Sequence, residues 1–195
     1  MDSPLLWSLI ALQIAFGAFD TLFHHEFTER LPWRASQKDE LRLHGVRNLF
    51  YSAIFLVIGW TEPKGVLAAA LLGVLALEIV ITLMDFVEED RSRRLPASER
   101  VLHTLLALNY GAILALFAPL LVAWSGEATG VDVVSRGLMS WLCVFAAVGT
   151  ALFGLRDLGA ARRLARMTPR RAAPLAAGLK AGSRVLVTGA TGFIG

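Results

Sequence analysis

A polar pattern that occurs twice inside apolar sequence constrains this chain most. The two copies lie 59 positions apart, and both have the gaps 14, 4 and 7 between successive members. Their members are Glu26, Glu40, His44 and Tyr51 in the first copy, and Asp85, Glu99, His103 and Tyr110 in the second. On an α-helix, positions i, i+4 and i+11 lie near one face. Each copy therefore predicts an acid, an imidazole and a phenol in one column.

The sequence around both copies is apolar enough to cross a bilayer. Apolar residues make up 55% of the chain, its mean hydropathy is +0.58, and only 18% of residues are charged. The charged fraction is below the roughly 25% of soluble domains, and the hydropathy excludes an ordinary soluble fold. Five apolar segments approach the roughly 20 residues that a membrane span needs: residues 5–27, 36–60, 66–87, 99–124 and 133–155. We expect an all-α polytopic membrane protein, a four-helix bundle built from two repeated hairpins (residues 1–60 and 61–124) plus a fifth transmembrane helix.

The basic residues predict the orientation of these spans. Seventeen of the 19 Lys and Arg residues lie in the connections after the first and third spans, in the polar start of the second span, or beyond the fifth span. Only Lys64 and Arg136 lie on the other side. The positive-inside rule then places the N-terminus outside and the C-terminus in the cytoplasm, as in a bacterial inner membrane. The basic segment 156–171 is expected on anionic lipid rather than on nucleic acid, because it contains no aromatic residues.

Ionisable side chains inside membrane spans are costly and indicate a functional site. The order along the chain is acid, Glu-His, acid, Glu-His, which resembles the di-metal carboxylate four-helix bundles. The resemblance implies a dinuclear centre of Fe, Mn or Zn, although the spacing here is Glu-x-x-x-His rather than Glu-x-x-His. The expected ligands are His24, Glu26, Glu40, His44, Asp85, Glu99 and His103. The side chains expected to support them are Asp20, Arg47, Asn48, Tyr51, Glu78 and Tyr110.

Several alternatives remain open for this site. On the first span, either Asp20 with His24 or Glu26 faces it, and the sequence does not choose between them. The polar residues could also form an ion-pair network without metal, or His44 and His103 could hold haem. We expect His25 at the membrane interface and residues 88–94 in a solvated turn.

The last 13 residues have another character. Residues 183–195 read SRVLVTGATGFIG, a short β-type run followed by Gly189, Gly192 and Gly195. This resembles the first strand and phosphate-binding turn of the extended short-chain dehydrogenase/reductase family, which includes NAD-dependent epimerases and dehydratases. The resemblance implies that the three glycines bind NAD(P) in a full-length protein.

These observations together predict three parts and two possible functions. Residues 1–155 form the membrane domain, residues 156–182 a basic cytoplasmic linker, and residues 183–195 the start of a truncated nucleotide-binding domain. We expect a membrane metal centre beside an NAD(P)-dependent oxidoreductase or epimerase that acts on a lipophilic substrate. The fragment alone should have no dehydrogenase activity, and the sequence assigns neither catalytic residues nor an oligomeric state. The alternative is a non-catalytic anchor for the dehydrogenase domain.

Overall fold

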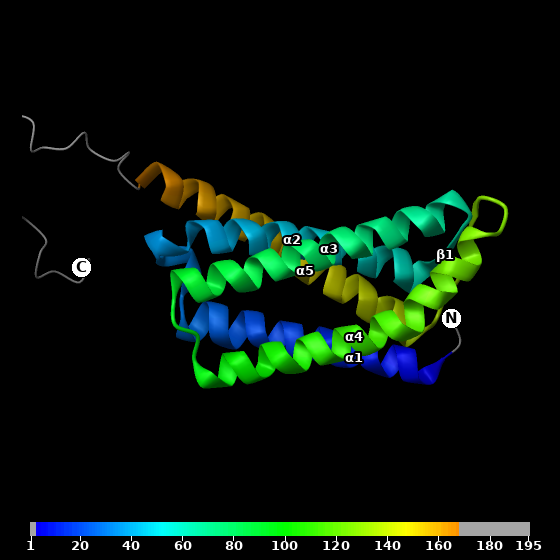
Figure 1. Cartoon of the computed structure of the whole chain (residues 1–195), viewed down its shortest axis with the longest axis horizontal. Coiled ribbons are helices and arrows are strands. Elements are labelled where there is room, and N and C mark those ends of the chain that lie inside the picture. Colours follow the sequence, from blue (N-terminus) through cyan, green and yellow to red (C-terminus); the bar gives the residue numbers. More distant parts are fainter. Residues whose placement is uncertain (1–2, 168–195) are drawn as a thin grey trace, which may run out of the picture.

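Five long helices dominate the computed structural model, which describes residues 3–167 (Figure 1). They are α1 (Pro4–Phe19), α2 (Lys38–Trp60), α3 (Val66–Ser92), α4 (Ala97–Ser125) and α5 (Leu138–Met167). The first helix continues as a π-helix, η1 (Asp20–Thr28), and two short 3₁₀ turns, η2 (Leu31–Trp33) and η3 (Ala35–Gln37), lead into α2. All five helical segments are long and apolar enough to cross a membrane. The expectation of an all-helical chain is thus confirmed in outline.

The helix boundaries follow local chemistry. The Ser3 side chain accepts a hydrogen bond from the Leu6 amide, and Pro4 occupies the first turn, where its missing N–H does no harm. Gly65 precedes α3 with φ of +57°, a conformation that side chains disfavour, and a Cβ there would lie 2.4 Å from the Thr129 hydroxyl. Only glycine fits this turn.

A small antiparallel sheet joins two connections at one end of the bundle. Strand β1 (Thr61–Lys64) follows α2, and strand β2 (Gly130–Val133) follows α4, with Thr61 opposite Val133. The sequence predicts turns rather than strands here, and a helix over residues 133–155. Strand β2 ends at Val133 and residues 134–137 connect it to α5, so this helix begins at Leu138, later than expected. It also continues past residue 155 to Met167.

The packing order differs from two simple hairpins. Helix α2 packs most extensively on α5 and also on α3, while α4 packs on both α1 and α3. Helices α1 and α2 contact each other little. Glycines allow α2 and α5 to approach closely: a Cβ on Gly154 would lie 2.9 Å from the Gly45 carbonyl oxygen. Helix α5 is therefore part of the bundle and supplies residues to its interior.

The interior divides into an apolar and a polar part. Near the sheet, the buried core contains Leu6, Ile54, Leu71, Phe117 and Leu121. Toward the connections between α1 and α2 and between α3 and α4, many buried side chains are acids, histidines and arginines, beside a small apolar cluster around Leu31 and Leu41. Large apolar side chains face outward instead. The described helices thus have an apolar exterior around a partly polar interior.

Candidate metal centre

The π-helix η1 turns three polar side chains of the first span into the bundle. Its hydrogen bonds join residues i and i+5, and such segments often occur at functional sites. Asp20, His24 and His25 are only 4%, 1% and 2% exposed, while Phe23 and Phe27 face outward. Of the two alternatives for the first span, Asp20 with His24 rather than Glu26 is therefore turned into the bundle. The expected interfacial position of His25 is wrong, because the wider π turn brings residue i+5 onto the face of Asp20.

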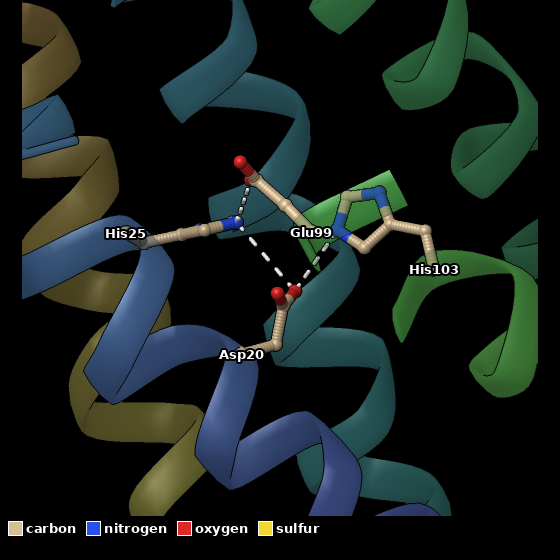
Figure 2. A group of neighbouring side chains, drawn as sticks. All are labelled: Asp20, His25, Glu99 and His103. Carbon is tan, nitrogen blue, oxygen red and sulfur yellow. Dashed lines mark hydrogen bonds and ion pairs between the residues drawn. The ribbon is translucent and has the colours of Figure 1, made fainter. Parts of the chain in front are cut away.

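Four buried side chains from η1 and α4 converge on one point (Figure 2): Asp20, His25, Glu99 and His103. His25 Nε2 lies 3.6 Å from Asp20 Oδ2 and 3.6 Å from Glu99 Oε1. His103 Nε2 lies 3.1 Å from the same oxygen of Asp20. One ligand atom from each residue lies within 4.8 Å of all the others.

This arrangement suits a single metal ion. A tetrahedral ion with bonds of about 2.1 Å separates its ligand atoms by roughly 3.4 Å, close to the three distances of 3.1–3.6 Å and below the 4.8 Å limit of the whole group. Neither ring nitrogen of His25 has a hydrogen-bond partner among the described residues. A buried polar atom without a partner requires an explanation. A bound cation would supply the partner of His25 Nε2.

Arg93 joins the carboxylates at the starts of α2 and α4. Its Nη1 and Nη2 donate to both oxygens of Glu99 at 2.8 and 2.6 Å, and its Nε donates to Glu40 at 3.1 Å. Ser92 Oγ also donates to Glu40, at 3.0 Å. Burial opposes the charge of Arg93, yet these bonds raise the pKa of its guanidinium above the ordinary value. Glu40 is therefore held by Arg93 rather than by the group around Asp20.

The turn expected at residues 88–94 is not wholly solvated. Glu89 is 1% exposed, and its Oε2 lies 3.3 Å from His103 Nδ1. The Arg93 side chain is 5% exposed. Helix α3 continues to Ser92 and then turns back, which carries these two charges into the bundle. The carboxylate of Glu89 orients the His103 ring, as carboxylates commonly do for metal-binding histidines.

His44 lies beside the group but has its own partner. Its ring is tilted by 56° against that of His25, with centroids 4.5 Å apart, and its Nδ1 lies 2.9 Å from Asp157 Oδ2. Arg156 contacts both Asp157 and Glu26. Glu26 is thus on the side of η1 that faces α5. Asp157 was missed because residues 156–182 were expected to form a linker.

The remaining expected residues lie deeper in the bundle. Arg47 makes an ion pair with Asp85, with Nη1 and Oδ2 2.7 Å apart. Farther along, Thr82 donates to Glu78 at 2.5 Å, and the rings of Tyr51 and Tyr110 meet edge to face at 6.4 Å. Asn48 is buried at the contact of α2 with α5, where its Cβ lies 3.1 Å from a Cβ placed on Gly154.

The members of the repeated pattern therefore contact different partners. Of the seven expected ligands, Glu99 and His103 enter the four-residue group, while Glu40, His44 and Asp85 pair with Arg93, Asp157 and Arg47. His24 binds Asp20 Oδ1, at 2.8 Å, and thereby supports a member of the group. Asp20, expected only as a supporting residue, is at its centre.

Acids outnumber guanidinium groups in this interior. Among the described residues, seven carboxylic side chains are buried, and three arginines pair with members of this set. The seven are Asp20, Glu40, Glu78, Asp85, Glu89, Glu99 and Asp157. Uncompensated charge in low dielectric is strongly unfavourable. This excess negative charge can be relieved by protons on the carboxyl groups, by protons on the histidines or by a metal ion.

Comparison of the chain with protein-family models, with curated proteins and with solved structures returns no match. The expected nucleotide-binding glycines Gly189, Gly192 and Gly195 lie outside the residues that the structure describes. The site must therefore be interpreted from its own geometry and chemistry.

Proposed function

We propose that this chain is an integral membrane protein whose helix bundle binds one divalent metal ion through Asp20, His25, Glu99 and His103. The membrane assignment is supported by the apolar exterior. Outward-facing side chains such as Leu108, which is 68% exposed, and Phe145, which is 75% exposed, would be unfavourable in water but suit lipid. Lys and Arg asymmetry supports an external N-terminus and a cytoplasmic C-terminus.

The observation that carries the metal proposal is the buried His25 ring. Its Nε2 faces two carboxylates at 3.6 Å, too far for hydrogen bonds yet close enough for a shared cation. Two imidazoles and two carboxylates suit Fe, Mn or Zn better than Ca or Cu(I). The group supports one ion rather than the dinuclear centre suggested by the repeat, because Glu40 and His44 lie outside it. Glu99 would share its carboxylate between Arg93 and the ion.

The wider function we propose is that of the membrane part of an oxidoreductase. The resemblance of residues 183–195 to a nucleotide-binding turn supports an NAD(P)-dependent domain at the cytoplasmic end. The metal, when bound, would supply Lewis-acid or redox chemistry to a lipophilic substrate. The residues of the bundle would hold the ion, keep water out and orient the imidazoles.

The test is metal analysis of purified protein by mass spectrometry. We expect about one ion per chain in the wild type. His25→Ala and His103→Ala should each remove most of it, while His44→Ala, a matched change of a neighbouring buried histidine, should retain it. Metal content should also fall in acid, since imidazole must be neutral to coordinate. A metal-free wild type, or equal loss in all three variants, would refute the assignment.

A second function is favoured by the ion pairs. Arg93 with its two carboxylates and Arg47 with Asp85 could stabilise a non-catalytic anchor for the dehydrogenase domain. In that case the wild type would bind no stoichiometric metal, and Arg47→Ala would be less stable than either His25→Ala or His103→Ala. The reverse order together with bound metal would exclude the anchor as the whole function.

A further inference from the structure

A hydrogen-bonded chain of Ser98, His24 and Asp20 lies at the edge of the bundle. Ser98 Oγ is 3.2 Å from His24 Nε2, and His24 Nδ1 is 2.8 Å from Asp20 Oδ1. These contacts fit a single tautomer, in which Nδ1–H donates to the carboxylate and Nε2 accepts the serine proton. A nucleophile, a base and an acid that orients the base have this same order in serine hydrolases.

The serine is accessible, whereas its two partners are buried. Ser98 is exposed, while His24 and Asp20 are 1% and 4% exposed. Ser98 lines a shallow open groove of about 440 Å³, whose other lining residues are apolar. They are Phe19, Ala97, Val101, Leu102 and Leu105. Such a surface suits a hydrocarbon chain that approaches from the side of the bundle.

The first turn of α4 adds donors for negative charge. The helix starts at Ala97, so the amides of Ala97, Ser98 and Glu99 have no carbonyl partner within it. A helix N-terminus also carries partial positive charge. Amides of this kind stabilise the oxyanion that forms when a carbonyl is attacked. Two of the three residues line the groove itself.

We propose that Ser98 is the nucleophile of an acyl-ester hydrolase whose substrate is a carboxylic ester with a long hydrocarbon chain. Ser98 Oγ forms a bond to the ester carbonyl carbon while its proton passes to His24 Nε2. The C–O bond to the leaving alcohol then breaks, and His24 returns the proton to the alcohol oxygen. Water repeats the sequence on the acyl-serine, which releases the carboxylic acid and restores the serine.

This activity does not depend on a metal at the neighbouring group. Asp20 uses Oδ1 for His24 and presents Oδ2 to His25 and His103. The two oxygens of one carboxylate can therefore serve both sites. Loss of metal binding in His103→Ala with labelling of Ser98 retained would separate the two proposals, because His103 contacts Asp20 through Oδ2 and no described contact joins it to Ser98 or His24.

The test is covalent labelling with an alkyl fluorophosphonate, followed by peptide mass spectrometry of the detergent-solubilised chain. We expect phosphonylation of Ser98, no labelling in Ser98→Ala, and at least a 100-fold slower reaction in His24→Ala, as for loss of a general base. Ser8→Ala is the control, since Ser8 is an exposed serine of α1 bonded only to the Pro4 carbonyl among its described contacts. It should react as the wild type does.

The wild-type protein also provides an internal comparison of labelling rates. Ser98 and Ser8 can be compared in one sample, so a variant that fails to fold does not obscure the result. Ser98 labelled no faster than Ser8, or labelled equally in His24→Ala with an unchanged circular dichroism spectrum, would overturn the proposal. Turnover of a p-nitrophenyl ester of a long-chain acid, lost in Ser98→Ala, is the expected supporting result.

Discussion

Removing the guanidinium of Arg93 should destabilise the protein more than removal of an exposed arginine. Arg93 contacts the carboxylates of Glu40 and Glu99 at 2.6–3.1 Å, and both acids are fully buried. Arg93→Ala would leave the two acids near each other without their shared cation. Arg34 is the matched control, because its ion pair with Glu29 lies at 2.8 Å but the Arg34 side chain is 47% exposed.

The expected losses of stability in Arg93→Ala and Arg34→Ala differ clearly. Removing one partner of a buried ion pair costs about 3–5 kcal/mol, whereas an exposed pair contributes about 0–1 kcal/mol. For a chain of this length, 1 kcal/mol shifts the melting temperature by about 2–4 °C. We therefore expect Arg93→Ala to lower the melting temperature by roughly 6–20 °C. Arg34→Ala should lower it by at most about 4 °C.

The assay is thermal unfolding in a mild detergent, followed by circular dichroism at equal protein concentration. Adding Glu40→Gln and Glu99→Gln to Arg93→Ala should recover part of the loss, because the neutral amides no longer repel each other. Equal melting temperatures for Arg93→Ala and Arg34→Ala would refute the view that Arg93 neutralises the buried acids. No recovery in the triple variant would show that packing rather than charge dominates.

Two further predictions concern packing and orientation. Gly154→Ala should lower the free energy of unfolding by about 1–3 kcal/mol, because its Cβ would lie 2.9 Å from a backbone oxygen of α2. The control Gly149→Ala meets no atom within 4 Å and should be neutral or slightly stabilising. Equal unfolding temperatures for the two variants would contradict the close helix contact. Val133→Cys, at a position in strand β2 that is 81% exposed, should react with an impermeant maleimide on intact cells, while Trp33→Cys at the other end should react only after lysis. The natural Cys143 is buried and should give little background, and the opposite labelling pattern would reverse the topology.

The sequence by itself determined the helical class. Length and hydropathy sufficed for five long apolar helices, because each segment has about the 20 apolar residues that a bilayer span requires. The spacing of Glu99 and His103 also placed both on one face of α4, where the structure has them. These features depend on residues close together in the chain, so periodicity reveals them.

Tertiary structure alone decided which polar residues meet. His25 faces inward because η1 is a π-helix, and its i+5 hydrogen bonding is invisible to a pattern based on 3.6 residues per turn. Asp157 reaches His44 because α5 packs along α2, where Gly45 and Gly154 permit close approach. These partners are separated by 113 positions along the chain.

Because tertiary packing decides which residues meet, the two copies of the repeated pattern need not contact equivalent partners. Glu40 and Glu99 occupy equivalent positions in sequence, yet both contact Arg93, which lies outside the repeated pattern and folds back after α3. Two sequence copies in register predict equivalent helix faces, but they do not predict which charge will lie between them. Tertiary packing decides which cation lies beside each buried acid, and a nearby cation stabilises the acid in low dielectric.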